Sequence, residues 1–441
     1  MSARDVLVTL AVLCALPFCL LRTWVGLLVW SWLAYMNPHR LTWGFAYDLP
    51  FAQMVAATTL VGVLFANDRK PFLISRELVL LGALWVWFFL TSLGALYPED
   101  AWEKFNEVSK ILLMAFLVVP FFQDRHRLRM LLLVIAASLG FYGFKGGLFV
   151  LLSGGKHMVL GPPSSFFAAN TELALVMNMA LPLLLYLARE ETRWWLRRLL
   201  WAAFFLTIMT VPFTYSRGGV IGLVVVLVVL FVKARRRLLL IPVVAIGLVG
   251  FALFAPAQWM DRMETLEDVS ADGSAQLRLM SWRVALSIAE DRPVFGGGFK
   301  VFVHRATYDI YMPEYPRSFG HDAHSIYFNL IGEHGWGGLM IFVALVVLAF
   351  LRLHSIRRLA RLNPEVAWAA NYAHMIQASL ATYLVTGAFL SVAYFDLAYQ
   401  LLILVPVIHA VALQEIAAKA AAPAETVPEV VTLGRARAQA G

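Results

Sequence analysis

The residues best suited to proton transfer gather in one polar segment, residues 282–339. This segment mixes charged, glycine, histidine and aromatic residues, whereas the sequence on either side is mostly apolar. It contains the sequence HDAHSIYF, in which His321 and His324 precede an apolar stretch. A histidine at a helix start often caps or packs, but its near-neutral pKa makes it the side chain best fitted to accept a proton. We therefore expect the chemistry of the chain to lie in this segment.

Arginines supply the second candidate group, because a guanidinium suits a planar anion. Arg217 stands in the sequence YSRGG, in a turn too short to leave the membrane surface. A charge there is costly unless it meets an anion or a carboxylate. The alternative is a side chain that reaches from a helix end to the lipid surface. That behaviour favours the cytoplasmic side, whereas this turn faces out by the loop count given below, so we favour anion binding.

Residues 275–289 have helical spacing, with apolar positions interrupted by Arg278 and Arg283. This pattern predicts a helix at the membrane interface, with Trp282 at the level of the lipid headgroups. The two arginines then face either a polar site or lipid phosphates, and the sequence leaves both alternatives open.

Two glutamates complete the candidate set. Glu172, near the start of an apolar stretch, either complements a helix dipole or hydrogen-bonds a substrate hydroxyl. Glu333 falls on the helix face opposite His324, so the two do not form a simple metal-binding pair. The HDAH spacing is not a usual metal pattern either, and we predict no metal and no cofactor. The Gly296–298 triplet lacks the Lys-Ser/Thr of a phosphate loop.

The elements that position these residues are apolar. The 441 residues are 61% hydrophobic and 15% charged, and the mean hydropathy is +0.73. Runs of about 17–25 apolar residues recur, each long enough to cross a bilayer. We predict an all-α polytopic membrane protein with about twelve or thirteen transmembrane helices. The predicted spans are 5–21, 24–36, 51–66, 77–96, 108–122, 130–152, 171–188, 199–214, 218–232, 238–255, 325–351, 370–391 and 395–413.

Basic residues fall on every second loop, which predicts that those loops are cytoplasmic. The clusters are Arg69/Lys70/Arg76, Arg125/Arg127/Arg129, Arg189/Arg193/Arg197/Arg198, Lys233/Arg235/Arg236/Arg237 and Arg352/Arg357/Arg358/Arg361. The net charge of +8 lies mostly there and is no footprint of nucleic-acid binding. The intervening loops face out: 37–50, 97–107, 153–170, 215–218 and the long loop 256–323. We divide the chain into a transmembrane region at 1–190, a core at 191–415 and a disordered cytoplasmic tail at 416–441.

The polar segment resembles the O-antigen ligase and O-antigen polymerase superfamily of bacterial inner-membrane glycosyltransferases. The resemblance rests on R-x-x-x-W at 278–282, D-x-P-V-x-G-x-G at 291–298, H-S-x-Y at 324–327 followed by Glu333, Gly335 and Gly338, and S-R-G at 216–218. The sequence AYMNPHRLTWGFAYD at 34–48 is similar to a subgroup, the O-glycosylation ligases associated with the exosortase A system.

The resemblance implies a GT-C-like ligase architecture, with a large periplasmic loop before the last three spans. It implies an inverting, metal-independent ligase with a glycan on undecaprenyl diphosphate as the donor. The acceptor would be a hydroxyl of a glycan, lipid or protein at the periplasmic face, and membrane lipids would surround the chain. His324 would be the catalytic base, although His321 leaves open which histidine acts. The residues expected to bind substrate are Arg217, Arg278, Arg283, His321, Tyr327, Glu333 and Glu172.

Three alternatives remain from the sequence alone. A polymerase would differ only in its acceptor, a second lipid-linked glycan. A transporter or flippase of lipid-linked sugars would have internal repeats and charged or broken helices at mid-membrane. The sequence has few such features, and Lys145 is the main charge inside a predicted span. A non-catalytic scaffold would not require Arg217, Arg278 and His324 to converge.

Overall fold

The computed structural model describes residues 2–233, 273–313 and 320–421, and all of their regular structure is helical. The all-α class expected from the sequence is therefore confirmed. The α-helices are α1 (Ala3–Leu21), α2 (Thr23–Met36), α3 (Phe51–Phe65), α4 (Arg76–Leu93), α5 (Pro98–Phe121), α6 (Arg125–Ser153), α7 (Asn170–Glu190), α8 (Trp194–Thr210), α9 (Arg217–Lys233), α12 (Gly273–Asp291), α13 (Arg305–Tyr311), α14 (Ile326–Leu362), α15 (Ala367–Gly387) and α16 (Asp396–Ala421).

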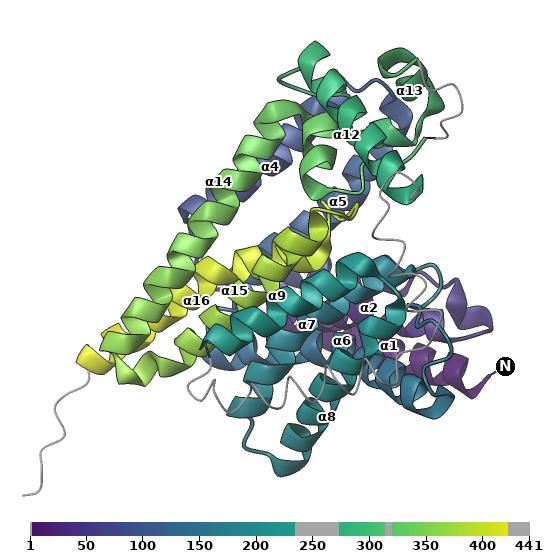
Figure 1. Ribbon diagram of the computed structural model, residues 1–441. Coiled ribbons are helices and arrows are strands. Elements are labelled where there is room, and N and C mark those ends of the chain that lie inside the picture. Colours follow the sequence, from purple (N-terminus) through teal and green to yellow (C-terminus); the bar gives the residue numbers. More distant parts are fainter. Residues whose placement is uncertain (1, 234–272, 314–319, 422–441) are drawn as a thin grey trace, which may run out of the picture.

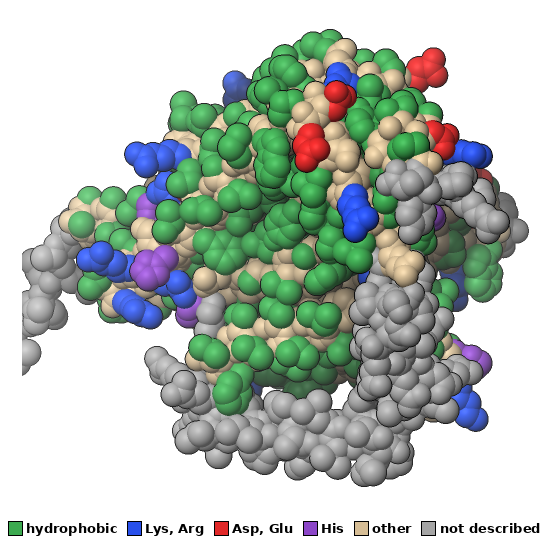
Figure 2. Space-filling model, turned by 45° about the horizontal axis from the view of Figure 1, so that its top comes forward, with side chains coloured by type: hydrophobic (Ala, Val, Ile, Leu, Met, Phe, Trp, Pro, Cys, Tyr) green, Lys and Arg blue, Asp and Glu red, His purple; other side chains and the backbone are tan. Residues whose placement is uncertain are grey.

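Every predicted span except 238–255 overlaps one of these helices, and 238–255 lies outside the described residues. Within the described part, α1, α4, α6, α7, α14 and α16 are long and apolar enough to cross a membrane, and α2, α3 and α9 are shorter apolar helices. The chain is thus a polytopic membrane protein. Figure 2 shows hydrophobic side chains over most of one face, with charged side chains gathered toward its edges.

The helices alternate in direction, so the loops collect at two ends of the bundle. The site end carries α12, α13 and the N-terminus of α14, which form a lobe above the remaining helices (Figure 1). The far end carries the described basic clusters. Ion pairs join elements there: Arg352 Nε lies 2.9 Å from Glu77 Oε1, and Arg129 Nη2 lies 2.7 Å from Glu191 Oε2.

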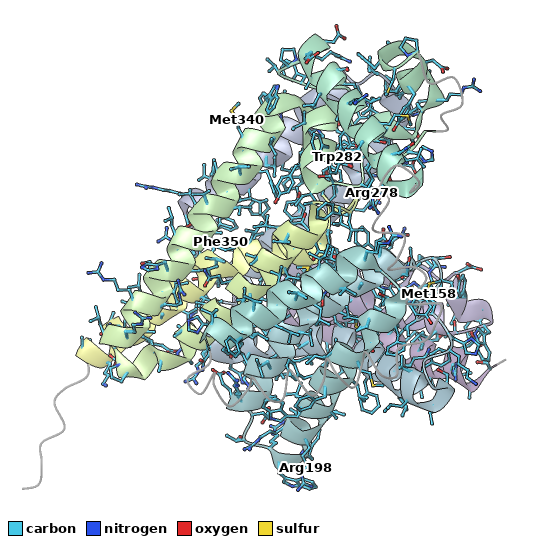
Figure 3. All side chains as sticks on the ribbon, in the orientation of Figure 1. Met158, Arg198, Arg278, Trp282, Met340 and Phe350 are labelled. Carbon is cyan, nitrogen blue, oxygen red and sulfur yellow. The ribbon has the colours of Figure 1, made fainter. Side chains whose placement is uncertain are left out.

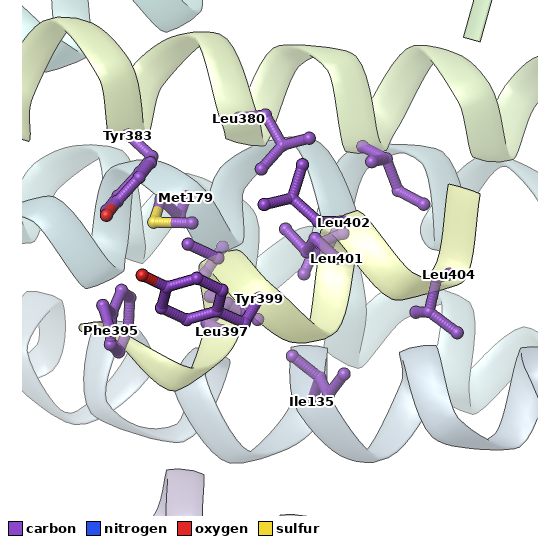
Figure 4. Close-up of a cluster of buried hydrophobic side chains, with 14 of the residues drawn as sticks. Ile135, Met179, Leu380, Tyr383, Phe395, Leu397, Tyr399, Leu401, Leu402 and Leu404 are labelled. Atoms are coloured by element: carbon purple, nitrogen blue, oxygen red, sulfur yellow. The ribbon is translucent and has the colours of Figure 1, made fainter. Parts of the chain in front are cut away.

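α7 is the central helix, because every residue from Leu173 to Ala188 is buried. A helix that is apolar all round needs neighbours on every side, and α6, α8, α9 and α15 supply them. Figure 4 shows the packing, with Met179 of α7 among side chains from α6, α15 and α16. One buried polar side chain joins α7 to α9, since Asn178 Nδ2 donates to the Gly219 carbonyl at 2.8 Å.

α6 and α8 approach closely through small residues, as membrane helices commonly do. A Cβ atom at Gly143 would lie 1.9 Å from Thr207 Oγ1, and one at Gly147 would lie 2.5 Å from the Leu206 carbonyl oxygen. These glycines let α8 lie against α6.

Two element boundaries differ from the sequence-based expectation. The predicted outer loop 97–107 is helical from Pro98, because proline at the first position and the acidic pair Glu99 and Asp100 favour a helix start. α16 continues to Ala421, into the predicted tail, and residues 422–441 lie outside the described part.

Candidate active site

His324 lies at the site end, directly before the Ser325 N-cap of α14. Its backbone is left-handed, with φ at +46°, a conformation that costs energy in a non-glycine residue and is concentrated at functional sites. The Ser391 hydroxyl, from the segment between α15 and α16, holds it there. The His324 backbone N–H donates to Ser391 Oγ at 3.0 Å, and His324 Nδ1 lies 3.5 Å from the same oxygen. Donation from Nδ1–H to Ser391 would leave Nε2 with its lone pair available.

Residues from three parts of the chain set the charge state of His324. Burial is the largest influence and lowers the pKa of His324 below its usual value. Arg278 of α12 and His321 lower the pKa further, whereas Asp322 and Glu172 of α7 raise it. The structure therefore brings three other predicted site residues, Arg278, His321 and Glu172, within electrostatic reach of His324. The net shift keeps the imidazole neutral near pH 7, the form that accepts a proton.

The direction of this shift predicts a pH profile. If neutral His324 accepts a proton during catalysis, kcat/KM should fall as the pH drops through its pKa, which lies below the ordinary histidine value. Asp322→Asn removes a negative charge that raises this pKa, so the acidic limb should move to lower pH. Asp309→Asn, on exposed α13 in the same lobe, is the matched control and should leave the limb in place. A shift to higher pH in Asp322→Asn would contradict this placement of the base.

Arg217 begins α9, and the described contacts bring its turn beside the start of α7. Asn170, the first residue of α7, donates from Nδ2 to the Thr214 carbonyl at 2.9 Å. Ser216 caps α9, because its Oγ accepts from the Gly219 N–H at 3.0 Å. A Cβ atom at Gly219 would lie 2.4 Å from Ala174 Cβ, so this glycine lets α9 meet α7. The Arg217 side chain is half-buried at the site end, near the helix that carries Glu172.

Three of the predicted substrate-binding residues have other surroundings. The Tyr327 hydroxyl donates to the Leu384 carbonyl of α15 at 3.0 Å. Arg283 is exposed, and it is not among the charges that act on His324. Glu333 is buried, and its Oε1 accepts from the Lys300 N–H at 2.8 Å while Oε2 accepts from the Tyr394 hydroxyl. None of these hydrogen bonds involves His324, and a role of the three residues in substrate binding stays a prediction.

α12 is helical as predicted. The Trp282 indole stacks on Phe328 of α14, with ring centres 4.6 Å apart, and its Nε1 donates to the Ala323 carbonyl at 2.9 Å. Trp282 therefore packs α12 against the start of α14, and its place at the level of the lipid headgroups stays a prediction. Figure 3 shows Arg278 one turn away on α12 and nearer the bundle. The tryptophan thus fixes the helix that presents Arg278.

A buried polar network, not expected from the sequence, lies behind Glu333. His334 is fully buried, with Nε2 at 2.7 Å from the Tyr394 hydroxyl and Nδ1 at 2.7 Å from Thr91 Oγ1. Since the Tyr394 hydroxyl donates its one proton to Glu333, the chain continues if His334 Nε2–H donates to the Tyr394 oxygen and the Thr91 hydroxyl donates to His334 Nδ1. It ties α4, α14 and the Tyr394 segment together.

The glycines of the two motifs meet at a break in α14. Gly335 has φ 64° and ψ −172°, which interrupts the helix. The carbonyls of Gly332 and Glu333 accept instead from the N–H groups of Gly297 and Gly298, at 2.8 and 2.9 Å. A third hydrogen bond joins the same two segments, because the Trp336 N–H donates to the Pro293 carbonyl at 2.9 Å. The motif at 291–298 and the motif around Gly335 are therefore one structural unit.

No group of three or more His, Cys, Asp and Glu residues in the described ranges is arranged to hold a metal ion. His324 and the charged side chains that act on it come from α7, α12 and the segment before α14. Such a site suits proton transfer beside an anion.

The fold and this site define a polytopic helical membrane protein with a polar site at one end of its bundle. Comparison with known families adds that residues 202–343 match the O-antigen ligase family. This match identifies an O-antigen ligase domain at residues 202–343 and supports the resemblance to that superfamily. Residues 3–192 match a family of unknown function (DUF5935). No curated protein matches the chain.

Proposed function

We propose that this chain is an inverting, metal-independent ligase that transfers a glycan from undecaprenyl diphosphate to an acceptor hydroxyl. The observation that carries the proposal is a half-buried histidine with a left-handed backbone, which lies within electrostatic reach of Arg278 and Glu172 from two other parts of the chain. The O-antigen ligase match supports a glycan ligase or polymerase type of function in general.

In the proposed reaction, His324 Nε2 accepts the proton of the acceptor hydroxyl as its oxygen attacks the anomeric carbon. The bond from that carbon to the diphosphate oxygen breaks, and attack from the opposite face inverts the anomeric configuration. Arg278 and Arg217 balance the charge that develops on the leaving diphosphate. Glu172 accepts a hydrogen bond from a sugar hydroxyl.

The far end, which carries the basic clusters, would face the cytoplasm by the positive-inside rule. The site end would then face the periplasm of a bacterial inner membrane. A reporter active only outside the cytoplasm, fused near Gly273, checks this orientation, and a silent fusion would contradict it. Membership of the exosortase-associated subgroup stays a prediction, since the match over residues 3–192 is to a family without a known function.

The arginines give the experiment that tests the donor chemistry. Lysine keeps the charge but loses the planar fork. Arg278→Lys should therefore lower transfer from a lipid-diphosphate glycan about ten- to hundredfold, the loss expected for one charged hydrogen bond. Arg278→Ala should lower it more, and the same order should hold at Arg217. Arg305→Ala, on the exposed helix α13, is the control and should transfer like the wild type. Full activity in Arg278→Ala would remove this residue as a donor ligand.

A further inference from the structure

A cavity with three basic residues in its wall lies in the N-terminal region, at the site end and away from His324. It has a volume of about 410 Å³, within the range of small-molecule sites. Its wall includes Arg4 of α1, Arg40 and Lys145 of α6. Met158, labelled in Figure 3, also lines it. None of these residues belongs to the site described above.

The wall is held by contacts between distant segments. The Tyr142 hydroxyl of α6 donates to the Met36 carbonyl at the end of α2. The Tyr47 hydroxyl lies 3.1 Å from Ser164 Oγ, which joins the segment after α2 to the one before α7. The cavity is thus built from several elements.

The three cations of this cavity are not neutralised by carboxylates. Across residues 2–233, 273–313 and 320–421, Arg4, Arg40 and Lys145 form no ion pair. Aromatic rings position the guanidiniums instead: the Arg4 carbon lies 4.9 Å from the Trp43 ring centre, and the Arg40 carbon 4.6 Å from that of Tyr47.

Asp5, which follows Arg4 in the sequence, makes hydrogen bonds to the backbone. Asp5 Oδ1 accepts from the backbone N–H groups of Gly44 and Ala46, at 3.1 and 3.2 Å, and so holds the segment that carries Trp43 and Tyr47. Its second oxygen accepts from the Ser2 N–H at 3.1 Å. Asp5 therefore builds the wall and does not pair with the cations.

Lys145 is the most informative of the three, because it interrupts α6, which is long and apolar enough to cross a membrane. A lysine in such a helix is costly, and it is found where it faces a polar cavity or a ligand. The rest of the wall includes apolar side chains, among them Phe149, Leu160 and Leu173. A ligand that fits both parts is anionic at one end and apolar or weakly polar at the other.

We propose that this cavity binds the phosphate group of an amphipathic molecule at the site end of the membrane. Three converging cations match a phosphate, and the apolar wall matches the group that carries it. Leu173 of the wall is adjacent in sequence to Glu172, so the bound molecule lies beside the start of α7. The source of the phosphate is either a bilayer phospholipid or a soluble phosphorylated molecule. The assignment does not depend on glycan transfer.

Amine reactivity tests this site in the intact wild-type chain. Both Lys145 and Lys156 are exposed, and Lys156 lies at the same end but outside the cavity wall. The chain is placed in nanodiscs of digalactosyldiacylglycerol, a neutral bilayer lipid without phosphate, treated with an acylating reagent and analysed by mass spectrometry. Inorganic pyrophosphate is added in one arm, and phosphatidylglycerol is included in the discs in the other. At ten times the dissociation constant, occupancy should slow acylation of Lys145 about tenfold, while Lys156 reacts as before.

Protection only by phosphatidylglycerol identifies a lipid headgroup, and protection by pyrophosphate in neutral discs identifies a soluble phosphate. Arg40→Gln should raise the concentration needed for protection about tenfold or more. His324→Ala should leave protection unchanged, which separates this site from the proposed reaction. Unchanged Lys145 reactivity in both arms, or equal protection of Lys156, would overturn the proposal.

Discussion

His324→Ala is expected to lower the rate of glycan transfer about 10²–10⁴-fold, the usual contribution of a positioned general base. The backbone of His324 is held left-handed by Ser391, and burial keeps its imidazole neutral near pH 7. Alanine removes the proton acceptor but leaves Arg278 on α12, which is anchored separately by the stacking of Trp282 on Phe328. Donor binding should therefore persist, and the loss should appear in kcat.

His321→Ala is the matched control for this prediction. The His321 carbonyl accepts from the Tyr308 hydroxyl, and this backbone contact survives the substitution. Among the influences on the pKa of His324, the charge of His321 is the smallest, so the loss of His321 should cost far less. Chelators should change neither variant. An inactive His321→Ala with a near-normal His324→Ala would show that His321, and not His324, is the base. Loss of activity with EDTA would contradict the mechanism itself.

Gly335→Ala is expected to prevent normal folding. The backbone of Gly335, at φ 64° and ψ −172°, lies in a region that only glycine adopts readily. A Cβ atom there would also lie 2.4 Å from the Val294 carbonyl oxygen. Strain and overpacking each cost about 1–3 kcal/mol, so the combined loss is about 2–6 kcal/mol. The hydrogen bonds from Gly297 and Gly298 to the break in α14 should then be lost. The segment that follows α12 would no longer be held against α14.

Gly82→Ala is the control, because a Cβ atom at Gly82 of α4 would meet only Phe116 at an ordinary 3.9 Å. Alanine there should be neutral or slightly stabilising. Size-exclusion chromatography of the solubilised protein, with its unfolding temperature, measures both variants. A monodisperse Gly335→Ala with the wild-type unfolding temperature would show that the motif glycines do not hold the lobe.

The helices and their alternation could be predicted from the sequence, because apolar length and basic loops are local signals. The sequence analysis predicted a loop at 97–107, where α5 is already helical from Pro98. The apolar pattern shows only the part of a helix that lies in the membrane and not a polar extension of it. Pro98 and its acidic neighbours were a signal for the start of this helix. Periodicity also predicted a helix at 275–289, as α12 shows. The side that Trp282 faces depends on Phe328, which is distant in sequence.

The candidate site was only partly predictable for the same reason. His324, Arg278 and Glu172 were each identifiable by residue type, but their meeting depends on contacts between α7, α12 and the start of α14. Ser391 gave no signal of its own. His334 and Tyr394 form a hydrogen bond although they are 60 residues apart in the sequence. Their only sequence signal is that each is a polar residue in or beside an apolar stretch. Glu333 had a recognisable motif, yet its buried partners, Lys300 and Tyr394, could not be inferred from spacing.

The central claim is that this chain breaks the bond between a glycan and its lipid diphosphate. The most direct measurement reconstitutes the purified protein in liposomes with an undecaprenyl-diphosphate glycan and an acceptor, and counts free lipid diphosphate and glycosylated acceptor together. The account predicts one molecule of each per turnover in the wild type and almost none in His324→Ala. If the glycan instead crosses the bilayer still attached to its lipid, with no release of lipid diphosphate, the chain is a transporter and the account is wrong.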